Sequence, residues 1–234
     1  MIDLRIDERF LLSKLEELAQ VGATATGGMM RPAYSEADLQ ARDWVETEMR
    51  ALGLTVRRDA AANSFGTLAG EANLPAILVG SHTDTVPNGG KYDGALGVLA
   101  ALAAVKALRD AEVQLRHPLT VVNFAAEEAT MSGGTFGSRA MLGLLSKAIL
   151  PHPAYDGRSV EANLRSAELD PQAIISLTPP QPEAFAAFLE LHIEQGDTLV
   201  RSGVPIGAVE GIVGIRRYQV IFNGYANHAG TTPM

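Results

Sequence analysis

An apolar run followed at once by metal-binding residue types is the feature that most constrains this chain. Residues 76–79 read AILV, and residues 80–94 read GSHTDTVPNGGKYDG, with one histidine and two aspartates among several glycines. The apolar run predicts a short buried strand, and the alanine- and leucine-rich segment 94–109 predicts a helix. Polar groups between such a strand and helix are typical of the functional edge of an α/β sheet.

Strand and helix patterns alternate along the chain. Residues 7–20 have helical apolar spacing, and a second helix is predicted from the capping box of Ser35 and Asp38 to a stop at Gly53. Further strands are predicted over 54–59, 64–70, 118–126 and 188–196, with loops and short helices over 151–182. This alternation predicts a mixed, largely parallel sheet with helices on its faces. The pattern changes near Gly211, so we expect a catalytic metal-binding domain over 1–210 and the first strand of another domain in 211–234.

Composition narrows the possible partners. Of 234 residues, 47% are hydrophobic, and the net charge of -8 comes with no basic patch interleaved with aromatic residues, which argues against nucleic-acid binding and favours small-molecule partners. The chain has no cysteine, so any metal site must use His, Asp and Glu. Its start lacks a signal-peptide core and its longest apolar run is too short for a bilayer. We therefore expect a cytoplasmic protein without membrane partners.

Three predicted strands end in residue types that bind divalent metal ions. Carboxyl ends of parallel strands meet at one edge of a sheet, so these groups are expected to lie together. Each group alone would more often be a solvated loop residue; it is their combination that favours a metal site. The strand ends carry His82 and Asp84, Glu127 and Glu128, and His192 and Glu194.

Physical chemistry suggests how these residues divide the work. Asp93 is the best candidate to bridge two ions, because it precedes a helix N-terminus and is followed by a glycine; the alternative is that it only caps the helix. Asp84 is placed to fix the His82 tautomer. Of Glu127 and Glu128, one would bind metal and the other act as general base, which requires the chain to turn directly after Ala126. An exposed pair without a function is the alternative.

Four ordered motifs carry a resemblance to a known family. Residues 80–98 (GSHTDTVPNGGKYDGALGV), 125–128 (AAEE), 190–196 (ELHIEQG) and 224–234 (GYANHAGTTPM) resemble the hydantoinase/carbamoylase branch of the M20 metallopeptidase-like amidohydrolases. This branch includes N-carbamoyl-L-amino acid hydrolases, allantoate amidohydrolases and β-ureidopropionases. The resemblance implies a three-layer α/β/α catalytic domain, an inserted lid that forms a homodimer, and two divalent ions, either zinc or manganese, cobalt or nickel.

The resemblance also implies roles for particular residues. His82 and His192 would bind one ion, Asp93 would bridge, Glu128 would bind the second ion, and Glu127 would be the general base. In the same way, Asp84 would support His82, His228 would reach a partner subunit's site and polarise the scissile carbonyl, and Gln195 would contact the ureido group of the substrate.

The chain departs from the family pattern in three places. Ala129–Met131 stands where relatives carry a small residue and then Arg-Phe, and Ala62 stands where many carry glycine. The substrate-carboxylate residues and the last metal-binding histidine of relatives follow the matched region, so the resemblance implies that residues 1–234 are the N-terminal part and inactive alone. The leading expectation is an N-carbamoyl-L-amino acid hydrolase; the alternatives are an allantoate amidohydrolase or β-ureidopropionase, an M20 aminopeptidase or dipeptidase, and a noncatalytic fragment.

Overall fold

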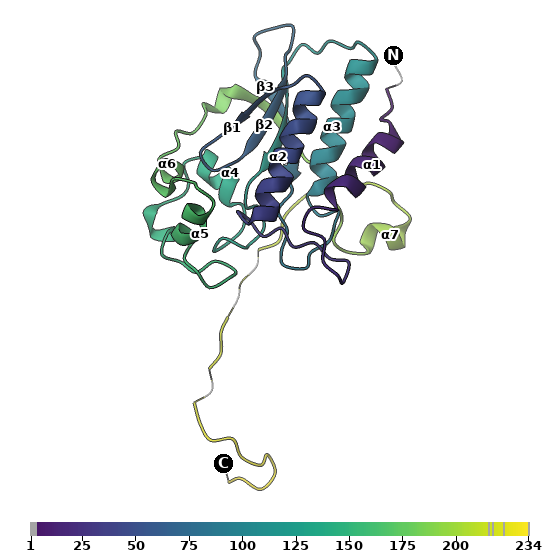
Figure 1. The fold of residues 1–234 in the computed structure, drawn as a ribbon. Coiled ribbons are helices and arrows are strands. Elements are labelled where there is room, and N and C mark those ends of the chain that lie inside the picture. The colour runs from purple at the N-terminus through teal and green to yellow at the C-terminus, as the bar shows by residue number, and fades with distance from the viewer. Residues whose placement is uncertain (1–3, 215, 217, 222, 234) are drawn as a thin grey trace. The chain divides into compact units, whose positions relative to one another are not determined.

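The chain consists of two compact units, residues 1–193 and residues 194–234. A computed structural model describes residues 4–214, 216, 218–221 and 223–233 (Figure 1). The first unit contains the sheet and six of the seven α-helices found in the described residues. The second unit, considered by itself, contains the helix α7 (Thr198–Ser202).

A mixed five-stranded sheet forms the centre of the first unit. Its order is β1-β2-β4-β3-β5, with β1 at Thr55–Arg58, β2 at Ser64–Leu68, β3 at Ala76–His82, β4 at Leu119–Phe124 and β5 at Phe185–Leu189. β3 pairs in parallel with β4 and β5, whereas β2 pairs antiparallel with β1 and β4. The expected mixed α/β fold is confirmed, with the parallel part confined to β4, β3 and β5. That part carries the ends of the strands from which the site is built.

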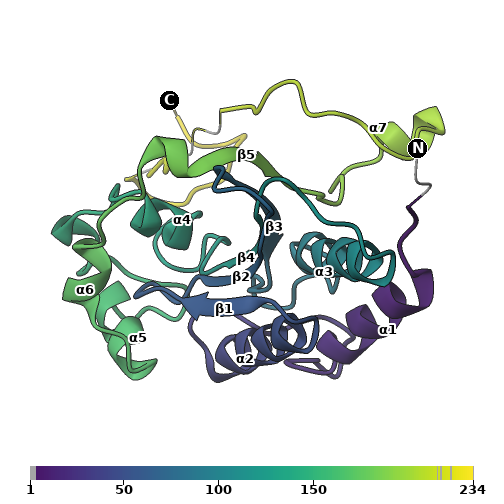
Figure 2. The same ribbon diagram turned by 90° about the horizontal axis from the view of Figure 1, so that it is seen from above.

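Helices cover both faces of this sheet (Figure 2). On one side lie α1 (Glu8–Leu18), α2 (Glu36–Ala51) and α3 (Ala95–Asp110), and on the other lie α4 (Phe136–Met141), α5 (Val160–Ser166) and α6 (Pro171–Ile175). Successive side chains of β4 point to opposite faces of the sheet, so the hydrophobic core has one part on each face. Val121 packs with residues of α1, α2 and α3, and Val122 packs with Phe65 and Leu78. Two 3₁₀ turns, Lys147–Ile149 and Pro182–Ala184, complete the helical elements.

The second helix begins as its capping box predicts. The Ser35 side chain accepts a hydrogen bond from the Asp38 amide at 3.3 Å, and the Asp38 carboxylate accepts one from the Tyr34 amide at 2.8 Å. The helix ends before Gly53, which adopts a φ of 72°. Its inward face is not wholly apolar, since Asp38 and Arg42 are fully buried on it.

Two expectations about the C-terminal part require correction. β5 begins at Phe185 and ends at Leu189, where the sequence pattern predicted a strand over 188–196, because its extent is set by its register on β3. Among the described residues of 211–233 none is in a strand; Ile215, Arg217, Phe222 and Met234 lie outside the description. The assignment of 211–234 to a lid domain stays a prediction. None of the helices in the described residues is long and apolar enough to cross a membrane.

Candidate active site

The ends of β3 and β5 and the start of α3 bring His82, Asp93 and His192 together. Their potential ligand atoms all lie within 4.8 Å of one another. The Asp93 Oδ1 atom is 3.2 Å from His192 Nε2 and 4.0 Å from His82 Nε2. Two imidazole nitrogens and a carboxylate oxygen are donors that zinc and related divalent ions accept, so the cluster is a candidate metal site.

Both histidines are held in the orientation that a metal ligand needs. His82 Nδ1 lies 3.0 Å from the Asp84 carbonyl oxygen, and His192 Nδ1 lies 2.8 Å from the Ile193 carbonyl oxygen. A carbonyl only accepts, so each Nδ1 carries a proton, and Nε2, the ring nitrogen nearer Asp93, is the one available to a metal ion. This arrangement of both rings is an observation independent of the spacing that predicted the site.

Gly94 is the N-cap of α3, which leaves Asp93 outside the helix. It adopts a φ of 62°, and a methyl group added to it would lie 2.5 Å from Cδ2 and Cε1 of His82. The backbone here needs both a positive φ, with ψ at -44°, and the absence of a side chain. Close packing of α3 on the His82 ring is therefore what brings Asp93 to the cluster.

The turn required for the glutamate pair is present. Ala126 adopts a φ of 50°, and its carbonyl oxygen accepts a hydrogen bond from the Phe136 amide at 2.9 Å. The chain thus leaves the direction of β4 before Glu127, whose Oε2 lies 3.5 Å from His82 Nε2. Glu127 is 37% exposed, so water can reach its carboxylate. Glu128 is not a member of the His82–Asp93–His192 cluster, and its role as a metal ligand stays a prediction.

Asp84 supports the site differently from the way its spacing predicted. Its carboxylate is 3.7 Å from His82 Nδ1, which is too long for a hydrogen bond, and the Asp84 backbone carbonyl takes that position instead. The carboxylate accepts hydrogen bonds from the amides of Glu127 at 3.2 Å and Glu128 at 3.1 Å. Asp84 is therefore linked by its backbone to the histidine and by its side chain to the glutamate pair.

Burial and neighbouring charges shift the pKa values of these groups. Burial opposes protonation of His82, but the Asp84 and Glu127 carboxylates outweigh it and raise the pKa of the imidazole. Burial raises the pKa of the Glu127 carboxyl above its ordinary value, and Asp84 and Glu190 add to this effect while His82 opposes it. A carboxylate with a raised pKa is a stronger base toward water.

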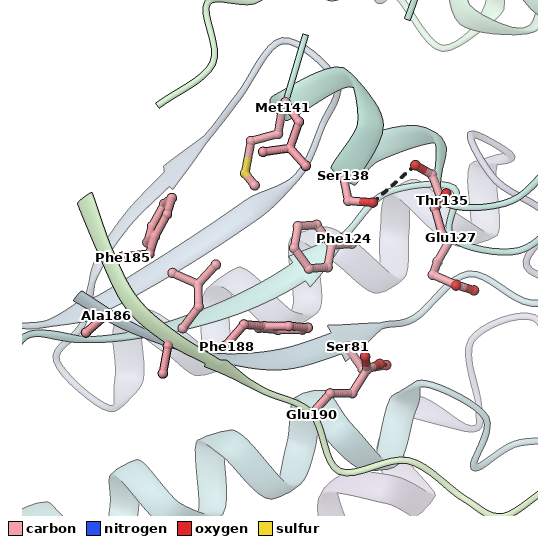
Figure 3. A pocket seen from close by; sticks show the side chains of 13 residues that line it. Ser81, Phe124, Glu127, Thr135, Ser138, Met141, Phe185, Ala186, Phe188 and Glu190 are labelled. Atoms are coloured by element: carbon pink, nitrogen blue, oxygen red, sulfur yellow. Dashed lines mark hydrogen bonds between the residues drawn. The ribbon is translucent and has the colours of Figure 1, made fainter. Parts of the chain in front are cut away.

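Glu127 also lies at the polar end of a pocket of about 510 Å³ (Figure 3). Phe124, Phe185 and Phe188 form much of its apolar wall, and the Phe124 and Phe188 rings meet edge to face at 5.9 Å. Ser81 donates a hydrogen bond to Glu190, and both residues line the pocket together with Glu127. Glu127 therefore borders an open pocket whose lining includes residues of β5.

Two predicted site residues belong to the second unit. Gln195 lies in the turn before α7 with a φ of 55°, and the exposed His228 accepts a hydrogen bond from the Gly230 amide at its Nδ1. The roles of both residues at the site stay predictions.

Several residues that support the site were not predicted from the sequence. Asn63 accepts a hydrogen bond from the Ala125 amide at 2.8 Å, and Arg42 donates to carbonyl oxygens at the end of β4. Ala62 retains a left-handed φ of 64° where many relatives were expected to carry glycine, and its carbonyl accepts from Arg42. The available signal was the Asp38–Arg42 spacing of four residues on the helix face that also carries Ala41, Val45 and Met49.

The fold and the strand-end cluster define an α/β protein with a candidate divalent metal site. A family model for Peptidase family M20/M25/M40 matches residues 78–231, so the chain belongs to this family. The matched range includes every residue of the cluster.

Curated relatives fall in the branch that the motifs resemble. The chain is 40% identical over 226 residues to an N-carbamoyl-L-amino acid amidohydrolase of Geobacillus stearothermophilus, covering 96% of this chain and 55% of the relative. It is 41% identical to an allantoate amidohydrolase of Bacillus subtilis (94% and 53%) and 37% identical to a ureidoglycolate hydrolase of Arabidopsis thaliana (99% and 50%). The chain thus spans about half the length of these relatives.

Solved structures agree with this placement. A hydantoinase/carbamoylase family amidase from Burkholderia ambifaria superposes with a TM-score of 0.75 at 34% identity, covering 86% of this chain and 48% of that one. The corresponding amidase from Burkholderia multivorans gives 0.76 at 29% identity, with 86% and 49% covered. The resemblance to the hydantoinase/carbamoylase branch is confirmed.

Proposed function

We propose that this chain carries the metal-binding half of the catalytic machinery of an amidohydrolase that cleaves a linear amide or ureido C–N bond. The observation that carries the proposal is the His82–Asp93–His192 cluster with Glu127 beside it, 3.5 Å from His82 Nε2. N-carbamoyl-L-amino acids are the leading substrate class. Allantoate, β-ureidopropionate and ureidoglycolate share the ureido group and are the alternatives.

In the proposed reaction Glu127 is the general base. His82, Asp93 and His192 would hold a divalent ion, which would supply Lewis acidity and lower the pKa of water from 15.7 to about 7, as such ions do in favourable sites. The Glu127 carboxylate takes the proton of the attacking water as the new C–O bond forms. It then returns a proton to the nitrogen whose bond to the ureido carbon breaks. Glu128 is proposed to hold a second ion that Asp93 shares with the first.

Ammonia release from a panel of ureido substrates tests the proposal. The complete gene product, reconstituted with zinc, manganese, cobalt or nickel, is expected to release ammonia from N-carbamoyl-L-amino acids. Allantoate, β-ureidopropionate and ureidoglycolate are assayed in parallel to place the substrate. Cleavage of dipeptides without ammonia release from any ureido compound would replace the proposal with a peptidase, an alternative that the family name keeps open. No turnover of either class by metal-loaded protein would favour a noncatalytic binding role.

Metal stoichiometry offers a separate prediction. Residues 1–234 alone are expected to hold about one equivalent of zinc firmly, because one cluster of three ligands is gathered in the described residues. Glu128 and a shared Asp93 would offer a second ion only carboxylates, which bind zinc-like ions weakly without imidazole. Elemental analysis after dialysis measures the stoichiometry. Two firmly held equivalents would show that the second site is complete within residues 1–234.

The proposed role of His228 has a complementation test. His228→Ala and Glu127→Gln subunits of the complete gene product are each expected to be nearly inactive. Mixed dimers contain one site with both groups if His228 acts across a two-fold interface, so equal mixing should recover about a quarter of the unmodified activity. Recovery is measured after subunit exchange shown by native mass spectrometry. Exchange without recovery would place His228 in its own subunit's site, and a fully active His228→Ala variant would place it outside the reaction.

A further inference from the structure

A fully buried arginine, Arg42, lies near the site and is not one of the three residues of the cluster. Arg42 on α2 has its guanidinium Nε 3.1 Å from the Asp38 carboxylate and its Nη2 3.6 Å from Asp84 Oδ1. Both carboxylates and the guanidinium are completely buried. Arg42 is hydrogen-bonded to Asp38, whereas its contact with Asp84 is a buried ion pair too long for a hydrogen bond, so its hold on Asp84 is electrostatic.

Arg42 also binds the end of β4. Its Nη2 donates to the Phe124 carbonyl oxygen at 3.0 Å, and its Nη1 donates to the Asn123 carbonyl oxygen at 3.3 Å. These carbonyls come directly before the turn that leads to Glu127. One guanidinium therefore joins the loop after β3, through Asp84, to the end of β4.

Asp84 connects Arg42 to the backbone of the glutamate pair. Its two carboxylate oxygens accept hydrogen bonds from the amides of Glu127 and Glu128, one to each oxygen. A carboxylate is free to rotate about its Cβ–Cγ bond unless its surroundings fix it. The guanidinium of Arg42 is a rigid planar group whose own position is set by Asp38 and by three carbonyl oxygens.

The buried charges balance across this region. Arg31 donates hydrogen bonds to the Thr83 carbonyl oxygen at 2.9 Å and to the Val21 carbonyl oxygen at 2.8 Å. It therefore also binds the loop after β3, the loop that contains Asp84. Two cations and two anions are fully buried here: Arg31, Arg42, Asp38 and Asp84. Removing Arg42 alone would leave two carboxylates against one guanidinium, whereas removing Asp38 and Arg42 together preserves the balance.

We propose that Arg42 is a positioning residue that fixes Asp84 and, through it, the backbone of Glu127 and Glu128 relative to the metal cluster. Its influence on turnover rests on the proposed function. Its influence on the Glu127 and Glu128 amides does not depend on any activity. These two consequences can therefore be measured separately.

The decisive variant is the double substitution Asp38→Asn/Arg42→Gln, which removes one buried negative and one buried positive charge. It is compared, in the full chain, with the single substitutions Arg42→Gln and Arg42→Lys. Arg42→Lys keeps the charge and loses the planar fork, and it serves as the test variant if the glutamine variants do not fold. Arg50→Gln is the matched control, since Arg50 lies on the same helix, is 57% exposed and pairs with Glu46. Thermal unfolding identifies the folded variants.

Amide hydrogen exchange read by NMR gives the first result. In the double variant, exchange at Glu127 and Glu128 is expected to be at least about tenfold faster, while amides within α3 are unchanged. A folded variant with unchanged Glu127 and Glu128 exchange would overturn the proposal, because Asp84 would then hold its place without Arg42. A merely structural role would accelerate exchange throughout the unit, and that outcome would also overturn it.

Kinetics in the complete gene product give the second result. The double variant is expected to lose about 10- to 100-fold in kcat with KM changed less than about twofold, because a supporting residue is removed and no substrate contact is lost. Arg50→Gln should leave both constants unchanged. If the unmodified gene product hydrolyses no ureido compound, the proposed function fails, and the exchange result still decides the role of Arg42.

Discussion

Glu127→Gln in the complete gene product is expected to lower ammonia release by about 10² to 10⁴ while the bound metal is retained. The amide keeps the shape of the side chain and cannot accept a proton from water. The His82–Asp93–His192 cluster does not include Glu127, so the change leaves its three ligands in place. The rate is measured at saturating substrate, and metal content is measured by elemental analysis on the same preparation.

Glu183→Gln is a suitable control for this experiment. Glu183 is exposed in the 3₁₀ turn before β5, so the same chemical change there should leave rate and metal unaltered. A near-normal rate for Glu127→Gln would assign the base to another group. Loss of the metal would make Glu127 a ligand and would leave Glu128 as the candidate base.

Gly94→Ala is expected to weaken zinc binding by about 100-fold or more, comparable to or beyond the loss of an outer-shell partner. The added methyl group would overlap the His82 ring, which is only 1% exposed. Alanine at a φ of 62° also costs roughly 1–2 kcal/mol in backbone strain. Isothermal titration with zinc measures the affinity, and thermal unfolding of the metal-free protein measures the strain.

Gly90→Ala provides the comparison. Gly90 lies four residues earlier in the same loop, and a methyl group there would meet no atom within 4 Å. It should leave zinc affinity unchanged. If Gly94→Ala binds zinc as tightly as Gly90→Ala, the His82 ring is not held by the packing of Gly94 in the way described above.

Local sequence signals predicted the elements that depend on local chemistry. Ser35 and Asp38 predicted the start of α2, and the need for a turn after Ala126 was met by its left-handed backbone. The limits of β5 were not predictable, because Phe185 to Leu189 are selected by pairing with Ala76 to Val79, far away in the sequence. The antiparallel attachment of β2 to β4 was missed for the same reason: sequence alternation does not encode strand direction.

The site was predictable to the extent that it follows strand ends. His82, Asp93 and His192 could be grouped because the carboxyl ends of parallel strands share an edge. The exact partner of each polar atom could not be read from spacing. Asp84 shows this, since one residue places its carbonyl on His82 and its carboxylate on Glu127 and Glu128. Arg42 was missed because tertiary contacts, and not its neighbours in sequence, give it a buried role.

The late position of β5 in the chain has a consequence for the order of folding. The contact between Ser81 and Glu190 joins residues 109 apart in the sequence, so the segment that carries His192 must close a long loop before it can dock on β3. Closing such a loop costs entropy that few contacts offset until the strand is paired, which makes this docking a slow, late event. A divalent ion would need His192 in position, and therefore β5 paired with β3, to meet all three residues of the cluster. An ion bound there would stabilise the paired state, because the unpaired state does not present the complete ligand set.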